Sequence, residues 1–393
     1  MSRIDELITK LCPNGVEHKV LGDVGKFIRG NGLQKSELTF TGVPAIHYGQ
    51  IHTHYGTWTN STKSFTDAIL AVKLRRALPG DLIIATTSED DIAVAKATAW
   101  LGDEEVAVSG DAYIFRHTLD PKYVAYFFQS EGFQSQKTRG ITGTKVRRIS
   151  GESLSKIAIP VPPVEVQREI VRILDAFTEL EAELEAELEA RRIQYAYYRD
   201  QLLTFPPTGG VRWVPMGELL ANLDSQRRPV TRSSRETGQY PYYGANGVQD
   251  FVSDYIFDGT FLLMGEDGSV MQENGSPVLN WATGKIWVNN HAHVLTEKSK
   301  EIRLRFVYHY LKTTTIREFV TGSAQPKLNQ ANMNRILIPV PDVAHQDEII
   351  DTLDKFETLT SDLTIGLPAE ISARRQQYEY YRDHLLTFDE TSA

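Results

Sequence analysis

The feature that most constrains this chain is a long helical pattern that begins after Pro163 and runs to Phe205. Apolar residues recur there at every third or fourth position, and neither glycine nor proline interrupts the stretch. This spacing places the apolar side chains on one seam of an α-helix. At 1.5 Å per residue, about 39 residues form a rod of roughly 58 Å. Because an isolated helix would leave this seam in water, we expect a second helix to cover it.

The same chain is predicted to supply the second helix, because the motif is repeated. IPVPPVEVQREIVRILDAFTEL from Ile159 aligns with IPVPDVAHQDEIIDTLDKFETL from Ile338. RRIQYAYYRDQLLTF from Arg191 aligns with RRQQYEYYRDHLLTF from Arg374. The first two segments lie 179 residues apart and the second two 183, so the second copy is four residues longer in its middle. GLP at residues 366–368 lies in that middle part and predicts a break or kink.

The segments before the two helices also resemble each other. GVEHKVLGDV, PGDLIIATTSED and TGTKVRRISGESLSKI align with GVRWVPMGEL, DGTFLLMGEDGS and TGSAQPKLNQANMNRI. Short apolar runs separated by Gly, Pro and Asp predict strands, and PKYVAYFFQSEGFQSQ predicts a helix on the sheet. We therefore predict two similar α+β globules, residues 1–156 and 206–335, each followed by a helical segment, residues 157–205 and 336–393.

Composition excludes several classes of protein. The lone Cys12 among 393 residues rules out an internal disulfide and a cysteine-based zinc cluster. No run of 18 apolar residues suggests a membrane span, so we expect no membrane partner. The first residues lack the apolar core of a signal peptide, and we expect a cytoplasmic protein.

The net charge of −9 is an average over unlike parts. Residues 1–156 hold 19 Lys and Arg against 17 Asp and Glu, and residues 206–335 hold 14 against 12. Residues 157–205 hold 5 against 10, and residues 336–393 hold 4 against 12. DNA would repel the acidic helices, whereas the globules can meet DNA through local basic patches.

Two stretches of the first globule have the composition of a DNA contact. The Gly- and Thr-rich stretch KTRGITGTKVRRIS contains five cations and suits phosphate contacts, and the alternative is a solvated loop. The five are Lys137, Arg139, Lys145, Arg147 and Arg148. HYGQIHTHYGTW offers imidazole, amide and phenol groups that can read or stack on bases. Its candidates are His47, Tyr48, Gln50 and His52. The alternatives are strand and core residues, or a metal site at His52 and His54. Since no nearby Cys or acidic residue completes such a site, we predict no metal.

The second globule has candidates of its own for phosphate and base contact. They are Arg227, Arg228, Tyr243, Asn246, Asn289, Asn290, Gln325, Lys327 and Asn329, with Arg232, Arg235, Tyr242 and His291 in the same stretches. Each of these residue types is more common as an ordinary surface or turn residue. Their role in DNA contact is therefore inferred from the duplication of the globules. An acidic turn at residues 89–91, with Glu266 and Asp267 in the matching place, can accept hydrogen bonds from cytosine. A turn or capping role is favoured for it.

The repeated motifs and the closing YYRDQLLTF and YYRDHLLTF resemble the specificity subunits of type I restriction-modification enzymes. The resemblance covers essentially the whole chain. It implies two target recognition domains, each reading one half of a bipartite, asymmetric DNA sequence. It also implies that the two long helices pack as an antiparallel coiled coil in a pseudo-two-fold duplication. The partners it implies are double-stranded DNA, two modification (methyltransferase) subunits and, in the full complex, restriction (motor) subunits.

The resemblance further implies a non-catalytic recognition subunit, so we predict no catalytic residue and no cofactor in this chain. S-adenosylmethionine, ATP and Mg are expected in the partner subunits. The sequence agrees, because it lacks the Asn/Asp-Pro-Pro-Tyr/Phe motif of adenine methylation and the Gly-x-x-x-x-Gly-Lys-Ser/Thr phosphate loop. The alternative is a stand-alone DNA methyltransferase or endonuclease with unfamiliar motifs, which S-adenosylmethionine binding by the purified chain would reveal.

Overall fold

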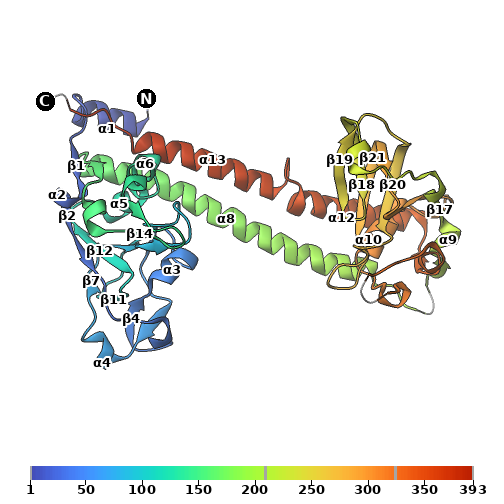
Figure 1. Ribbon diagram of the computed structural model, residues 1–393, viewed down its shortest axis with the longest axis horizontal. Coiled ribbons are helices and arrows are strands. Elements are labelled where there is room, and N and C mark those ends of the chain that lie inside the picture. Colours follow the sequence, from blue (N-terminus) through green and yellow to red (C-terminus); the bar gives the residue numbers. More distant parts are fainter. Residues whose placement is uncertain (1, 208–209, 323–324, 392–393) are drawn as a thin grey trace. The chain divides into compact units, whose positions relative to one another are not determined.

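The computed structural model describes residues 2–207, 210–322 and 325–391. The chain forms two compact units (Figure 1). Unit 1 comprises the chain up to Glu185 and again from Glu370, and unit 2 comprises Ala186–Ala369. Each unit therefore holds one globule and the stretches of helix that pack on it. The boundaries between the four predicted parts of the sequence, residues 1–156, 157–205, 206–335 and 336–393, remain a prediction.

The globule of unit 1 is built on two five-stranded sheets, with the orders β2-β12-β8-β10-β5 and β3-β6-β4-β11-β7. The strands of the first sheet are β2 (Gly25–Arg29), β12 (Ala112–His117), β8 (Leu82–Ala85), β10 (Ala97–Trp100) and β5 (Trp58–Thr59). Those of the second sheet are β3 (Leu38–Thr39), β6 (Ser64–Thr66), β4 (Val43–Ile46), β11 (Val106–Val108) and β7 (Arg76–Ala77). The central strand β8 is buried along its whole length, as its run of Leu, Ile and Ala requires.

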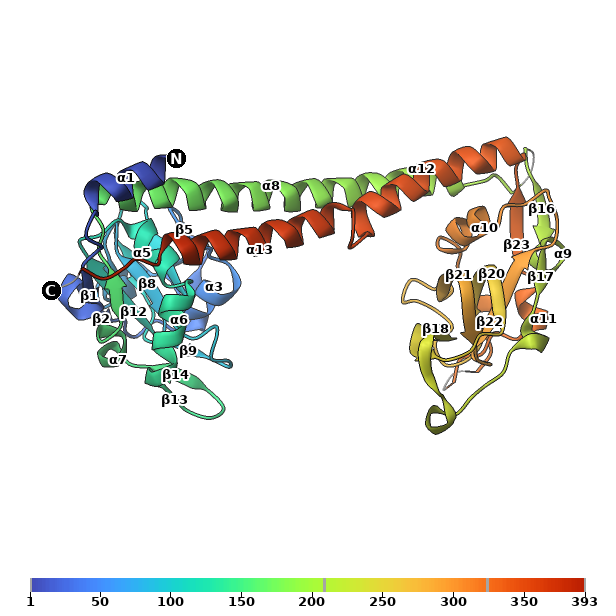
Figure 2. The ribbon, with the colours of Figure 1, turned by 90° about the horizontal axis from the view of Figure 1, so that it is seen from above.

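Short helices and two small sheets surround these strands. The helices are α1 (Arg3–Leu11), α2 (Leu21–Val24), α3 (Tyr48–Thr53), α4 (Ala68–Ala71), α5 (Pro121–Phe127), α6 (Glu131–Lys137), α7 (Gly151–Ser155) and the 3-10 turns η1 (Lys35–Glu37) and η2 (Thr138–Gly140). The small sheets are β1 (His18–Val20) with β15 (Ala158–Pro160), and β13 (Ile141–Thr142), β14 (Arg147–Ile149) and β9 (Thr87–Ser88). Figure 2 shows α5 beside the first sheet, where the predicted helix covers β8 and β10.

The globule of unit 2 has one six-stranded sheet of order β17-β22-β20-β21-β18-β19 and a two-stranded sheet of β16 and β23. The strands are β16 (Arg212–Pro215), β17 (Leu220–Asn222), β18 (Thr237–Gly244), β19 (Gly247–Val252), β20 (Phe257–Gly265), β21 (Leu279–Val288), β22 (Ala292–Glu297) and β23 (Leu337–Val340). The shorter helices are α9 (Met216–Leu219), α10 (Leu304–Leu311), α11 (Gln330–Met333) and the 3-10 turns η3 (Asp224–Gln226), η4 (Arg232–Ser234) and η5 (Arg317–Phe319).

The predicted duplication of the globules is confirmed in the pairing of their strands. Lys19 lies opposite Ile159 where β1 meets β15, and Val214 lies opposite Ile338 where β16 meets β23. These positions correspond under the sequence offsets of 195 and 179. The order β2-β12-β8-β10 of unit 1 likewise returns as β17-β22-β20-β21 in unit 2. The two globules are therefore versions of one α+β fold.

The first long helix, α8, spans Val164–Leu203 and has 40 residues, as its apolar seam predicts. The second is broken into α12 (Val343–Ser361) and α13 (Leu367–Leu385). The break falls where glycine and proline predict it. A Cβ on Gly366 would lie 2.4 Å from the carbonyl oxygen of Thr358, so the chain is too close there for another residue.

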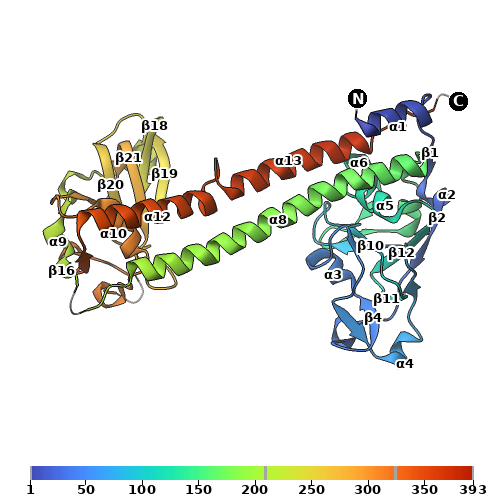
Figure 3. The ribbon, with the colours of Figure 1, turned by 180° about the vertical axis from the view of Figure 1, so that it is seen from behind.

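The seams of the helices pack as expected within each unit. In unit 1, Phe177 of α8 stacks on Tyr381 of α13 at 5.4 Å, and Glu181 of α8 pairs with Arg375. Later residues of α8 thus meet earlier residues of α13, which makes the pair antiparallel (Figure 3). In unit 2, Tyr198 stacks on Phe356 of α12 at 5.7 Å. Among the described residues, no helix has the length and apolar character needed to cross a membrane.

A glutamine at the start of each long helix joins it to the globule. In unit 1, Gln167 accepts a hydrogen bond from the Asp120 N–H at 2.9 Å and donates one to the Pro162 carbonyl at 2.8 Å. In unit 2, Gln346 accepts from the Arg303 N–H and donates to the Pro341 carbonyl, both at 2.8 Å. Both glutamines are buried, so each fixes the chain entering its helix.

An aspartate two turns further on forms a second joint. Asp175 accepts hydrogen bonds from Lys122 and the Tyr126 hydroxyl of α5, both at 2.7 Å. Asp354 accepts in the same way from Arg305 at 2.8 Å and His309 at 2.7 Å, both on α10. In each unit the two donors are four residues apart and so lie on one face of a helix.

Candidate nucleic-acid interface

The basic stretch of unit 1 folds into a hairpin formed by β13 and β14, with Gly143 at φ +91° in its turn. Lys145 and Arg148 are exposed, and neither forms an ion pair with any part of the chain that the structure describes. Arg147 is half-buried, because its guanidinium pairs with Asp91 at 2.9 Å and donates to the Gly143 carbonyl at 2.6 Å. The hairpin therefore presents two cations to solvent and uses the third to hold itself in place. The prediction is wrong for Lys137, which is buried at the end of α6 and donates to backbone carbonyl oxygens.

The aromatic and amide-rich stretch forms α3 and the end of β4. His47 caps α3, since its Nδ1 accepts from the Gly49 N–H at 3.2 Å. Gln50 accepts from the His47 N–H at 3.0 Å and donates to Ser64 at 2.7 Å, so its amide serves the fold. The ring of Tyr48 lies against that of His47, with centroids 4.6 Å apart and the ring planes tilted by 40°.

His47 and Tyr48 line a cavity of about 560 Å³ together with Arg29 and Lys35. Partial burial is the main cause that lowers the pKa of His47, and the nearby Lys35 acts in the same direction. The imidazole is therefore neutral at physiological pH, with Nδ1 accepting and Nε2 carrying the proton. Such a group can donate one hydrogen bond to a base edge without adding charge.

The structure brings α3 and the basic hairpin together, which the sequence did not indicate. Nε2 of His52 lies 2.9 Å from the carbonyl oxygen of Thr87 in β9, and Thr87 pairs directly with Arg148 in β14. Lys96, which no sequence pattern singled out, donates to the His52 carbonyl at 3.3 Å. Two distant candidate stretches thus share one edge of the globule, as required of a single contact surface.

The acidic turn after β9 has the capping role that we favoured. Asp90 accepts hydrogen bonds from the N–H groups of Ile92 and Ala93 at 2.8 and 2.7 Å. Asp91 is engaged by Arg147. In unit 2 the matching Glu266 and Asp267 are also engaged, by Arg227 and by His291. Of these five acids, Glu89 alone is exposed with no partner among the described residues.

The corresponding loop of unit 2 has the same frame with different surface residues. Thr321 and Lys327 form an isolated β-bridge, and Gly322, which follows Thr321, has φ +83°. Lys327 and Gln325 are exposed, and Lys327 lies 3.9 Å from Glu266. Asn329 caps α11 by accepting from the Asn332 N–H, as Ser150 caps α7 in unit 1. Lys327 occupies the place of Arg148, whereas Asn329 serves the fold.

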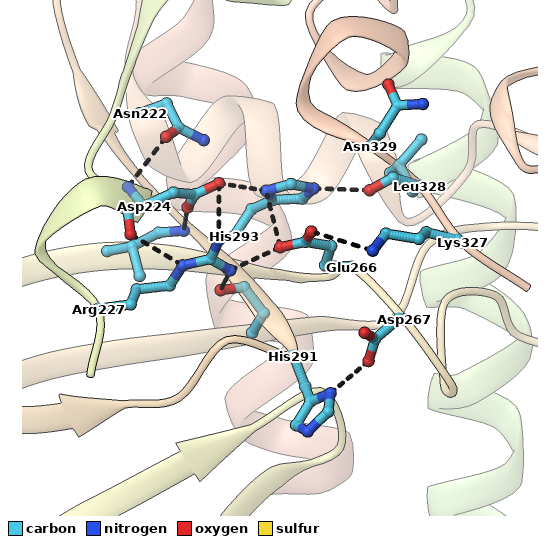
Figure 4. A network of polar contacts seen from close by, with 12 residues as sticks. Asn222, Asp224, Arg227, Glu266, Asp267, His291, His293, Lys327, Leu328 and Asn329 are labelled. Atoms are coloured by element: carbon cyan, nitrogen blue, oxygen red, sulfur yellow. Dashed lines mark hydrogen bonds and ion pairs between the residues drawn. The ribbon is translucent and has the colours of Figure 1, made fainter. Parts of the chain in front are cut away.

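Arg227 lies inside a polar network of unit 2 rather than on its surface (Figure 4). Its guanidinium is 2.7 Å from Glu266 and from the Ala292 carbonyl, and its side chain is 12% exposed. Asp224 joins the same network at 3.4 Å from Arg227 and 2.5 Å from the buried His293. Burial opposes ionisation of Asp224, but the hydrogen bond and charge of His293 hold its pKa below the usual value. Arg227 therefore links the end of β20, which Glu266 follows, to the start of β22 at Ala292.

The other candidates of unit 2 divide between turns and surface. Asn289 is buried and accepts from the His291 N–H at 2.8 Å, and Tyr243 is half-buried, with a pKa that burial raises. Arg228, Asn246 and Asn290 are exposed, the second in the tight turn between β18 and β19. Arg228, Asn246 and Asn290 therefore remain candidates for nucleic-acid contact, because their side chains are exposed.

In the part of the chain that the structure describes, two groups of carboxylates and histidines are compact enough for a metal ion: Asp224, Glu266 and His293, and His309, Asp354 and Glu357. In each group basic side chains already neutralise the carboxylates. Arg227 pairs with the first group, and Arg305 and Lys312 pair with the second at 2.7 to 2.8 Å. Both are therefore internal ion-pair networks.

A family model described as the type I restriction modification DNA specificity domain matches residues 13–190 and 214–373. A putative type I restriction enzyme specificity subunit of Haemophilus influenzae is 44% identical over 184 residues, which are 46% of this chain and 47% of that protein. The specificity subunit of an Escherichia coli type I restriction enzyme is 34% identical over 291 residues, 68% of this chain and 70% of the relative.

Solved structures have the same fold. The S subunit of a type I restriction-modification system from M. genitalium matches with a TM-score of 0.58 and 16% identity, covering 94% of this chain and 96% of that one. The corresponding subunit from Thermoanaerobacter tengcongensis matches with a TM-score of 0.51 and 16% identity, covering 95% and 97%. At this identity the likeness is one of fold.

Proposed function

Because the chain belongs to the family of type I restriction-modification DNA specificity subunits, we propose that it reads a DNA sequence in two separate parts, one with each unit. The observation that carries this proposal is the duplicated backbone pairing, of Thr142 with Arg148 in unit 1 and of Thr321 with Lys327 in unit 2. Each unit has the same loop frame at the same place, with exposed cations at Arg148 and Lys327, while the neighbouring side chains differ. The shared backbone pairing with an exposed cation suits contact with phosphates, which carry no sequence information. The different side chains beside it suit recognition of different base sequences.

The chain acts as a recognition subunit and not as an enzyme. In the proposed assembly two modification subunits transfer a methyl group from S-adenosylmethionine to adenine, which requires the base to leave the duplex for their pocket. Restriction subunits add ATP- and Mg-dependent cleavage. The acidic long helices, which carry far more Asp and Glu than Lys and Arg, are the proposed seat of the modification subunits.

Methylation profiling tests this function directly. Single-molecule sequencing of DNA from cells that contain the chain and its modification subunit reports every methylated adenine. We expect one motif made of two short specific parts separated by an unread gap, with a methylated adenine in each part. A single continuous motif, or methylation that does not depend on this chain, would contradict the proposal.

A further inference from the structure

The turn between β9 and β10 in unit 1, residues 89–96, has an exposed isoleucine near its middle. Ile92 is 83% exposed, which for an isoleucine leaves nearly the whole side chain in water. Loops with exposed tips are usually loosely held. This one is fixed at three points, so the exposure of Ile92 is built into the fold.

A buried lysine supplies the first point. Lys137 at the end of α6 is 2% exposed, and its Nζ lies 2.6 Å from the Ile92 carbonyl oxygen and 2.8 Å from that of Val94. Burying an amino group is costly unless its hydrogen bonds are satisfied. Here they are satisfied by the backbone on both sides of the turn, which aims the Ile92 side chain outward.

Backbone geometry supplies the other two points. Ala95 has φ +66° and is the one non-glycine residue with a positive φ in the described part of the chain. A non-glycine residue in this region is strained and often marks a functional segment. The N–H of Ala95 is tied to the Ala85 carbonyl at 2.9 Å, and Asp90 caps the opposite end of the turn through Ile92 and Ala93.

Three acidic residues, Glu89, Asp90 and Asp91, precede this apolar tip, and the nearest cations belong to the neighbouring basic hairpin. Asp91 in the turn pairs with Arg147, which ties the turn to the basic hairpin with its exposed Lys145 and Arg148. Lys96 is exposed at the end of the turn. An apolar side chain held beside a basic hairpin can contact base surfaces in a nucleic-acid groove while the exposed cations of the hairpin contact the flanking phosphates. A protein interface of this apolar kind would instead be depleted in charge at its centre.

We propose that Ile92 is an apolar base contact of unit 1 and helps to determine which half-site this unit accepts. The inference rests on the proposed function, since it presumes that unit 1 reads DNA. An aliphatic side chain meets bases in two ways, by touching a thymine methyl group in the major groove or by entering a base step from the minor groove. Both use the same apolar contact.

Binding of the Ile92→Ala variant to DNA tests the proposal. The full chain, assembled with its modification subunits, is titrated with duplexes that carry the target found by methylation profiling and with duplexes in which one half is scrambled. We expect the variant to bind the target roughly 5- to 100-fold more weakly, the range of a lost base contact. Duplexes in which the half read by unit 1 is scrambled should bind the wild type and the variant equally. The salt dependence of DNA affinity should stay unchanged because no charge is lost.

Ile69→Ala is the matched control, since Ile69 of α4 is 75% exposed in the same unit and lies in another segment. It should leave target binding unchanged. Replacing thymines of the unit 1 half by uracil identifies a methyl contact if the wild-type protein then loses the same affinity. Increased fluorescence of 2-aminopurine in that half identifies entry into a base step.

The inference is overturned if Ile92→Ala keeps the affinity and preference of the wild type. It is also overturned if the variant loses its modification subunits while its DNA preference remains, because Ile92 would then be a protein contact. Failure of the proposed function looks different, since the wild-type assembly itself would show no preference between target and scrambled duplexes.

Discussion

Lys145 and Arg148 are exposed cations on one hairpin, whereas Arg227 is 12% exposed among carboxylates. The same kind of charge therefore has opposite roles at these positions. An exposed cation near a phosphate releases counterions from DNA and strengthens binding in a salt-dependent way. A buried arginine neutralises buried carboxylates, which would destabilise the fold if they were left unpaired.

Replacing Lys145 and Arg148 together by alanine is expected to weaken DNA binding across all sequences. Each lost phosphate contact should reduce the slope of log affinity against log salt by about 0.9. The measurement is a salt titration of DNA affinity, with Lys10→Ala on α1 as an exposed-lysine control. Arg227→Ala should instead lower the free energy of unfolding, by about 3–5 kcal/mol for a broken buried pair. An unchanged slope in a folded double variant would remove the hairpin from the interface.

Lys137 gives the turn of residues 89–96 a dependence on pH. Burial lowers the pKa of Lys137 to about 8, although Asp90 and Asp91 favour its charged form. The unfolded chain holds this proton up to about the ordinary value of 10.5. Between the two values the unfolded state binds more protons than the folded state, so stability from this group rises with pH.

Lys137→Met is expected to lower the free energy of unfolding at neutral pH by about 1–3 kcal/mol, because two carbonyl oxygens lose their donor. The difference between wild type and variant should grow from pH 8 to pH 10.5, as the wild type gains stability that the variant lacks. Denaturant unfolding across this range measures both effects. Lys156→Met, at a lysine whose side chain is 71% exposed, should change stability by less than about 0.5 kcal/mol at any of these pH values. Equal pH profiles for Lys137→Met and wild type would contradict the assigned shift.

At the scale of elements, the sequence predicts the helices better than the joints. The period of apolar residues locates α8, and the glycine and proline at residues 366–368 locate the break between α12 and α13. The hydrogen bonds of Asp175 and Asp354 cannot be predicted from such patterns, because their donors lie about 50 residues away along the chain. The available signal was an aspartate repeated in both helices with two polar residues spaced by four on each preceding helix.

The candidate contact residues divide for the same physical reason. Residue type shows that Arg148 and Arg227 can both hold a phosphate, but only the folded chain shows which one faces carboxylates. Gln50 and Asn329 likewise have the right chemistry for a base and are used as caps. The turn that presents Ile92 was invisible in sequence, since a buried lysine from another element holds it.

At the scale of the whole molecule, the proposed function requires each unit to recognise its part of the DNA target independently of the other unit. The family model matches each copy separately, over residues 13–190 and 214–373, and each unit has its own core. Among the described residues, the main core cluster of each globule is made of residues of its own unit. Each unit should therefore carry its own sequence preference when moved into another chain of the family.

The most direct test exchanges residues 1–156 for the corresponding globule of another family member that recognises a known target. Methylation profiling by single-molecule sequencing then reads the specificity of the hybrid in cells. We predict that one half of the motif changes to that of the donor while the other half stays as in the parent. A hybrid that folds and methylates but changes both halves, or neither, would contradict the account.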